Sequence, residues 1–78
     1  MSPQLYEVDI HGMTVDEASI LLEDLLIDLP ETIKELVIIH GYKSGHRLKD
    51  YIRKELKHER IKRRMVSMNP GITSLILY

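Results

Sequence analysis

One run in the middle of the chain governs how the rest is understood: Val37-Ile38-Ile39-His40-Gly41-Tyr42-Lys43-Ser44-Gly45-His46. Its apolar, β-branched start is typical of a buried strand, and its two glycines form a loop that leads into a helical pattern. A strand, a glycine loop and a helix start in this order build anion sites in α/β proteins. Backbone N–H groups at the helix start face outward, and glycine lets a phosphate approach the main chain. The run therefore predicts a phosphate-binding edge.

A weaker copy of this pattern occurs earlier, as Val8-Asp9-Ile10-His11-Gly12. It also ends an apolar run, and a capping box, Thr14-Val15-Asp16-Glu17, opens the helix that follows. In open α/β sheets, ligands bind beyond the carboxyl ends of the parallel strands. We therefore expect His11 and His40 to lie close together at one edge of the sheet.

The remaining patterns complete a β-α-β-α-β-β order. Strands are expected at about 5–10, 36–39, 62–68 and 72–78, and helices at about 15–29 and 46–58. Residues 36–39 are too continuously apolar for a strand with one wet face, which favours a central parallel strand. Right-handed crossovers place both helices on one face, so the predicted fold is a two-layer α/β sandwich with a mixed four-stranded sheet.

Length and composition restrict the class of protein. A chain of 78 residues makes one domain, with residues 1–4 expected to be a loose N-terminal segment. There is no cysteine, which leaves neither a disulfide framework nor a thiolate metal site. No apolar run approaches the roughly 20 residues that span a bilayer, and the N-terminus lacks a signal-peptide pattern. We expect a cytoplasmic protein without membrane association, and a monomer by default.

The net charge of −1 conceals two oppositely charged halves. Residues 1–39 carry one lysine against nine acids, a net charge of −8, whereas residues 40–65 carry ten Lys and Arg against three acids, a net charge of +7. A half this basic predicts a polyanion partner, which here means DNA or RNA. The alternative is that the two halves face each other within the fold.

Three residues are candidates for catalysis. Asp9 and His11 are two apart on a strand, so both side chains emerge on one face, where a carboxylate fixes the tautomer of an imidazole and raises its basicity. With His40 as a partner acid, base or phosphate ligand, the set suits phosphodiester cleavage. The same three residues also suit a divalent metal such as Mg²⁺ or Mn²⁺. A purely structural role, with Asp9 capping the turn at Gly12, is the remaining interpretation.

The loop and the basic half supply the expected phosphate and nucleic-acid contacts. These contacts are assigned to Gly41, Lys43, Ser44, Gly45, Lys49, Arg53, Lys57, Arg63 and Arg64. Lys49, Arg53 and Lys57 are spaced at i, i+4 and i+8, which predicts one basic ridge along the second helix. Tyr42 is a candidate for stacking on a base.

Three segments together resemble the Smr (small MutS-related) domain, over about residues 5–78. They are Val8–Gly12 for an L-D-x-H-G motif, His40–Gly45 for an H-G-x-G-x-G loop, and Gly71–Thr73 for a late G-x-T element. Val8 stands where the family has leucine, and Lys43 stands where it has its middle glycine.

The resemblance implies a fold like the C-terminal domain of bacterial translation initiation factor three. It also implies nucleic-acid binding and an endonuclease that nicks DNA or cleaves RNA. Asp9, His11 and His40 occupy the motif positions of the acid and the two histidines. The alternatives are a non-catalytic module that binds nucleic acid or the ribosome, and a protein adaptor that uses the acidic first helix.

Overall fold

The computed structural model describes residues 4–42 and 46–78, so Lys43, Ser44 and Gly45 lie outside the described residues. The elements are β1 (Leu5–Asp9), α1 (Val15–Asp28), β2 (Glu35–Ile39), α2 (Arg47–Asp50), the π-helix η1 (Tyr51–Glu55), β3 (Ile61–Val66) and β4 (Ile72–Leu77). This order confirms the predicted β-α-β-α-β-β succession.

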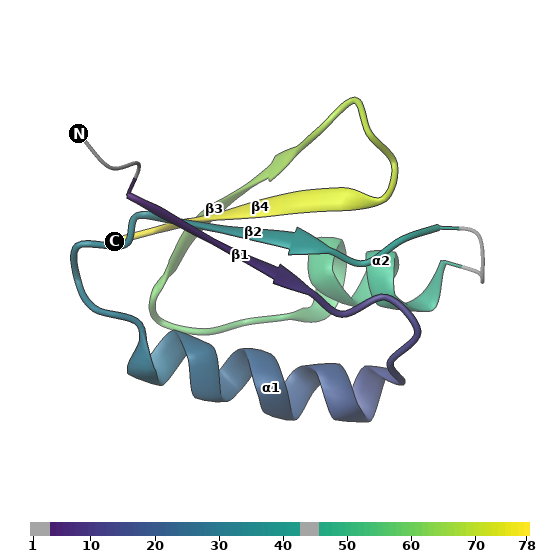
Figure 1. The fold of residues 1–78 in the computed structure, drawn as a ribbon, viewed down its shortest axis with the longest axis horizontal. Coiled ribbons are helices and arrows are strands. Elements are labelled where there is room, and N and C mark those ends of the chain that lie inside the picture. Colours follow the sequence, from purple (N-terminus) through teal and green to yellow (C-terminus); the bar gives the residue numbers. More distant parts are fainter. Residues whose placement is uncertain (1–3, 43–45) are drawn as a thin grey trace.

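The four strands form one mixed sheet in the order β1-β2-β4-β3. β1 and β2 run parallel, whereas β4 is antiparallel to both of its neighbours. Figure 1 shows α1 and α2 on the same side of this sheet. The two-layer sandwich with both helices on one face is therefore confirmed.

The core lies between the sheet and the helices. Alternate residues of the two central strands are buried toward the helices, and they include Leu36, Ile38 and Leu75. They meet Leu22 of α1 and Ile52 of η1 in a single buried cluster. This alternation is the period-2 pattern of a strand with one core face.

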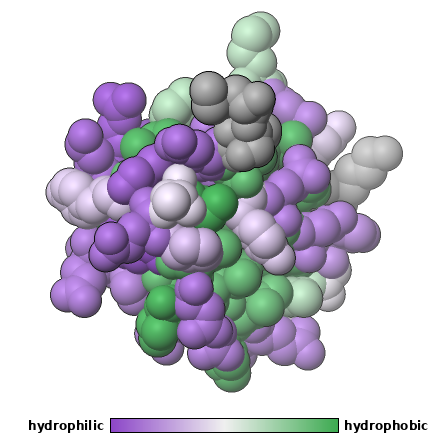
Figure 2. All heavy atoms as spheres, turned by 60° about the vertical axis from the view of Figure 1, so that its left-hand side comes forward, coloured by the Kyte–Doolittle hydropathy of each residue, from purple (hydrophilic) through white to green (hydrophobic). Residues whose placement is uncertain are grey.

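The other face of the sheet carries no helix in the described parts of the chain. Val37 and Ile39 point to it and are only partly buried. β2 is central, as predicted, but its unbroken apolar run does not mean that both of its faces are covered. Figure 2, from another side, shows hydrophobic atoms reaching the surface between hydrophilic side chains.

The sequence signals at both ends of α1 act as predicted. The Thr14 hydroxyl accepts a hydrogen bond from the Glu17 N–H at 3.1 Å, and the Glu17 carboxylate accepts one from the Thr14 N–H at 3.0 Å. At the other end, Leu29 is extended because it precedes Pro30. The helix is thereby fixed at its start by the capping box and at its end by proline.

Arg60 closes the carboxyl end of α1 from the other half of the chain. Its guanidinium donates to the carbonyl oxygens of Leu26 at 2.9 Å, of Leu29, and of Pro30 at 2.7 Å. The Leu26 and Leu29 carbonyls are among those that the end of α1 leaves unpaired, and the Pro30 carbonyl lies just beyond the helix. A positive charge at this end also complements the helix dipole. One cation of the basic half is thus a structural residue of the acidic half.

The second helix is shorter than predicted. It ends at Glu55 instead of about residue 58, and its last turn is a π-turn in which the Leu56 N–H bonds the Tyr51 carbonyl at 2.7 Å. The wider turn brings Leu56 into the core, where it is 5% exposed, and the chain then becomes extended. Lys57 follows the helix, so the expected ridge of cations at i, i+4 and i+8 does not form.

β3 is also shorter than predicted, since it ends at Val66 instead of Met68. A register shift between Ile61 and Arg63 marks its start. Among residues 4–42 and 46–78, no helix is long and apolar enough to cross a membrane.

Candidate functional site

The two His-Gly segments meet at one edge of the sheet. β1 and β2 are parallel and in register up to Asp9 and Ile39, and the Ile10 N–H continues the pairing to the Ile39 carbonyl at 2.9 Å. A Cβ built on Gly41 would lie 3.4 Å from Cβ of His11, so the main chain of one segment contacts the side chain of the other. The strand arrangement thus brings the two segments together, as the sequence predicts.

His11 and Asp9 form an exposed, closely bonded pair. His11 Nδ1 lies 2.5 Å from Asp9 Oδ1, which also accepts the His11 backbone N–H at 3.0 Å. These two bonds, the ring bond first, lower the pKa of the Asp9 carboxyl, so Asp9 is a carboxylate at neutral pH. A carboxylate can only accept, so Nδ1 carries the proton in the neutral ring. Nε2 is then left with its lone pair and has no partner among the residues described.

His40 is in a very different environment. It is 3% exposed, its Nδ1 donates to the Gly41 carbonyl at 2.8 Å, and its Nε2 accepts from the Thr73 hydroxyl at 2.9 Å. The Thr73 oxygen in turn accepts from Arg53 Nε at 2.8 Å, which leaves the hydroxyl proton for His40. Burial, followed by the charges of Arg53 and Lys49, lowers the pKa of His40. His40 is therefore a neutral ring with both nitrogens engaged.

This environment predicts a pH dependence of stability. Unfolded His40 takes up a proton near its ordinary pKa of 6.5, whereas folded His40 resists protonation. The unfolded state then binds more protons, so the free energy of unfolding should fall as the pH is lowered from 7 toward 5. Urea unfolding at several pH values measures this, with His40→Gln as the comparison. The variant should be less stable at pH 7 and lose less stability on acidification; an equal loss in both proteins would contradict the account.

The glycine-rich elements are joined by backbone bonds. The N–H groups of His40 and Gly41 both donate to the Gly71 carbonyl, at 2.9 and 3.0 Å. Gly71 itself lies against this segment, because a Cβ there would be 3.3 Å from Cα of Gly41 and 3.4 Å from Cδ1 of Tyr42. Gly41 has a φ of 73°, which favours glycine. The Gly41 N–H is thus already paired and is not the free phosphate donor that the sequence suggested.

The expected basic residues do not share one surface. Arg53 turns inward and donates to Thr73 and to the Ile72 carbonyl, and Arg64 donates to the Ile52 carbonyl at 2.7 Å. Arg63 pairs with Ile76 and Arg64 with Leu75, so these two neighbours point to opposite faces of the sheet. The arginines assigned to nucleic-acid contact in this strand are therefore divided between the two faces of the sheet.

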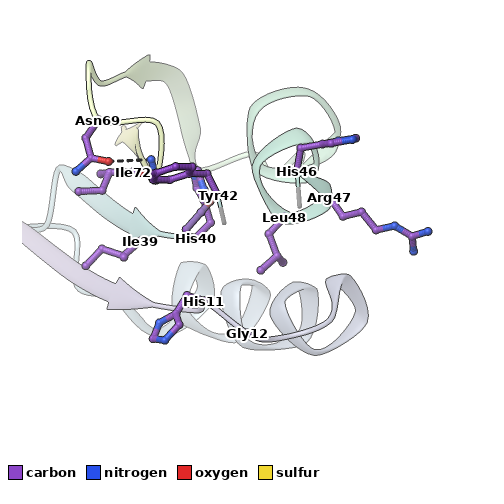
Figure 3. Close-up of a pocket in the computed structure, with 12 residues that line it drawn as sticks. His11, Gly12, Ile39, His40, Tyr42, His46, Arg47, Leu48, Asn69 and Ile72 are labelled. Atoms are coloured by element: carbon purple, nitrogen blue, oxygen red, sulfur yellow. Dashed lines mark hydrogen bonds between the residues drawn. The ribbon is translucent and has the colours of Figure 1, made fainter. Parts of the chain in front are cut away.

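A cavity of about 700 Å³ opens beside the two histidines. Its walls come from the ends of β1 and β2, the start of α2 and the turn before β4 (Figure 3). The residues that line it are His11, Gly12, Ile39, His40, Gly41, Tyr42, His46, Arg47, Leu48, Asn69, Gly71 and Ile72.

Several residues at this edge were given no functional role from the sequence. Arg47 adds a cation at the cavity wall, and His46 is held by Asp50, with Nδ1 to Oδ2 at 2.8 Å. That bond lowers the pKa of Asp50. Thr73, which fixes His40, had a signal in the sequence, namely its place in the Gly71–Thr73 element.

The described residues do not assemble a metal site. Within 4–42 and 46–78, no three His, Asp or Glu side chains converge as metal ligands. Asp9 and His11 bond each other, while His40 bonds Gly41 and Thr73. The three-ligand set proposed from the sequence is therefore not preformed.

The fold and the site at the edge of the sheet define a small α/β domain in which a His-Gly pair follows each of the two parallel strands. The family model of the Smr domain matches residues 8–71, which is more than half of the chain. The chain belongs to the Smr domain family, which is known for nucleic-acid binding and nicking.

A solved structure agrees with this assignment. The chain is similar to the crystal structure of the Smr domain of Thermus thermophilus MutS2, with 26% sequence identity and a TM-score of 0.80. The match covers 92% of this chain and 96% of the other. No curated protein gives a significant match.

Proposed function

We propose that this Smr domain binds single-stranded or nicked nucleic acid at the edge formed by His11, Gly41 and the cavity, and cleaves its phosphodiester backbone. The observation that carries the proposal is the Asp9–His11 pair. An exposed imidazole with its Nδ1 proton committed to a carboxylate presents Nε2 as a base. This arrangement lies at the wall of a cavity large enough for a substrate.

The chemistry assigned to His11 is the same for both nucleic acids. With RNA, Nε2 takes the proton of the 2′-hydroxyl, and the 2′-oxygen attacks the adjacent phosphorus; the P–O5′ bond breaks, the 5′-oxygen leaves with a proton from water, and a 2′,3′-cyclic phosphate remains. With DNA, Nε2 takes a proton from a water molecule, whose oxygen bonds the phosphorus while one P–O ester bond breaks and the leaving oxygen takes a proton from water. The carboxylate of Asp9 stabilises the imidazolium that forms. Because the described residues preform no three-ligand metal set, parallel reactions with chelator, Mg²⁺ and Mn²⁺ belong to the test.

His40 enters the proposal as a positioning residue. Its ring is buried and bonded through Thr73 to Arg53, so it holds the Gly41 segment against His11. This differs from the role of acid or base that the sequence suggests. It also favours a second candidate function, a module that binds nucleic acid without cleaving it, since one of the two histidines is already fully bonded.

The cations assigned to binding are those not tied to the fold. Arg47 and Lys49 lie at the start of α2, and Arg47 lines the cavity. Lys57 and Arg63 are exposed, whereas Arg53 and Arg64 act within the fold. Lys43, Ser44 and Gly45 remain proposed phosphate contacts from sequence alone.

Charge reversal tests where the polyanion binds. We expect the double variant Arg47→Glu, Lys49→Glu to bind a labelled single-stranded oligonucleotide more weakly than the unaltered protein. The slope of log affinity against log salt should fall by about 1.4, which corresponds to two lost phosphate contacts on a single strand. Fluorescence anisotropy between 50 and 200 mM salt measures both.

The matched control is Lys34→Glu, which reverses the single cation of residues 1–39 in an exposed position. Its affinity and salt slope should equal those of the unaltered protein. Equal effects of the two changes, or no salt-dependent binding to RNA or DNA, would contradict the proposed interface.

A further inference from the structure

We propose that the cavity receives one unpaired nucleobase, which stacks on Tyr42 next to the phosphodiester that faces His11. The inference rests on the proposed function and specifies its substrate: a strand whose bases are not paired at the site. It follows from the size of the cavity, the chemistry of its walls and the position of Tyr42.

The cavity is too large and too apolar for a phosphate alone. Its volume of about 700 Å³ falls within the range of about 300–1,000 Å³ typical of small-molecule sites. Ile39, Leu48 and Ile72 contribute apolar wall. Phosphate gains nothing from such a surface, because it needs N–H groups or cations, whereas the flat faces of a base are apolar.

Tyr42 is placed to act as a stacking surface. It follows Gly41 at the end of β2, and its side chain is 52% exposed although it lines the cavity. One edge of the ring rests against Gly71, whose missing Cβ would lie 3.4 Å from Cδ1. In Figure 3, Tyr42 lies beside Asn69, in the turn before β4, and Ile72, at the start of β4, and α2 with Leu48 lies across from it. The backbone around Tyr42 is held by the bonds of Gly41 to Gly71, so the aromatic ring sits on a fixed support.

Polar groups around this surface fit the rest of a nucleotide. Asn69 Oδ1 accepts the Gly71 N–H at 2.9 Å, which orients the amide so that its NH₂ group is left to donate to a base acceptor. Arg47, on α2, supplies a charge for a flanking phosphate. His11 on another wall of the same cavity places the proposed base catalyst near the sugar of the bound nucleotide.

A pocket of this kind discriminates between paired and unpaired nucleic acid. In a duplex, both faces of every base are stacked, and extruding one base costs a few kcal/mol. An unpaired base enters without this cost. Single-stranded segments, loops and frayed ends at nicks should therefore bind more tightly and be cleaved faster than regular duplex.

The experiment uses oligonucleotides that carry 2-aminopurine, a base whose fluorescence reports stacking. Unaltered protein and Tyr42→Phe, which keeps the ring, should change the fluorescence of a single-stranded oligonucleotide on binding. Tyr42→Ala should lose this change and bind the strand about 5- to 150-fold more weakly, which is the effect of one lost base stack. Affinity for a regular duplex should be the same for all three proteins.

The control is Tyr78→Ala, which removes an exposed tyrosine after β4, at the end of that strand away from Gly71. It should behave as the unaltered protein, and circular dichroism checks that each variant is folded. Salt-dependent binding that is unchanged by Tyr42→Ala, with equal affinity for single strand and duplex, would overturn the base pocket and leave the proposed function standing. Absence of any binding by the unaltered protein would overturn both.

Discussion

Replacing His11 by alanine should lower the rate of phosphodiester cleavage by about 10²- to 10⁴-fold, the contribution usual for a general base. Asp9→Asn should have an effect of similar size, because an amide no longer stabilises the protonated ring or enforces the tautomer that leaves Nε2 free. Both side chains are exposed, so the stability of the fold should change little. Single-turnover cleavage of end-labelled RNA and nicked DNA, in chelator and in Mg²⁺ or Mn²⁺, measures the rate.

Glu7→Gln is the matched control for Asp9→Asn. Glu7 is two residues earlier on β1, on the same face of the sheet, and is exposed. The change removes one carboxylate from the same strand without touching His11, so the rate should be unaltered. If His11→Ala cleaves as fast as the unaltered protein, the proposed mechanism is wrong. If no protein cleaves any substrate while binding persists, the non-catalytic alternative is correct.

Arg60→Met should lower the free energy of unfolding by about 2 kcal/mol. The change keeps most of the apolar stem but removes the charged donors that close the carboxyl end of α1, and hydrogen bonds from charged groups contribute about 1.5–3 kcal/mol. Part of the loss is recovered because water can reach carbonyls at a helix end. For a chain of 78 residues, whose total stability is about 4–12 kcal/mol, this is a large share.

Arg63→Met provides the comparison, since the Arg63 side chain is exposed on β3 and makes no hydrogen bond or ion pair to any described residue. Its effect on urea unfolding should stay within about 0.5 kcal/mol. For nucleic-acid affinity the order is reversed: Arg63→Met removes a cation proposed to bind nucleic acid, whereas Arg60→Met does not. Equal losses of stability in the two variants would show that Arg60 does not hold α1.

The sequence was sufficient to predict that the two His-Gly segments lie at one edge of the sheet, because general rules connect the order of strands and loops to their arrangement in space. Parallel strands end on the same side, so two His-Gly steps that follow apolar runs had to meet. The Thr14–Glu17 capping box and the stop at Pro30 depend on neighbouring residues alone, and both were predicted correctly.

The functions of the cations could not be predicted, because they depend on partners distant in sequence. Arg60 bonds carbonyls about thirty positions earlier, and Arg53 bonds Thr73, which also fixes His40. A charge count treats these arginines and the exposed Arg63 alike. The basic half therefore combines two expectations that the sequence offered as alternatives: some of its charge serves the fold and some faces solvent.

The two candidate histidines show the same limit. The sequence placed both His11 and His40 at the same edge as candidate catalytic groups, because both precede glycine after an apolar run. The period of a strand explains why they differ, since His40 lies in register with Leu36 and Ile38 on the core face, and His11 continues the face of Asp9. One is consequently buried and neutral, and the other is exposed beside a carboxylate.

The location of the nucleic-acid site is tested most directly by NMR titration of the ¹⁵N-labelled protein with a short single-stranded oligonucleotide. The largest amide shift changes should occur around the cavity, at residues 11–12, 40–42, 46–48 and 69–72. Changes concentrated on the exposed acidic face of α1, with the cavity residues unaffected, would contradict it.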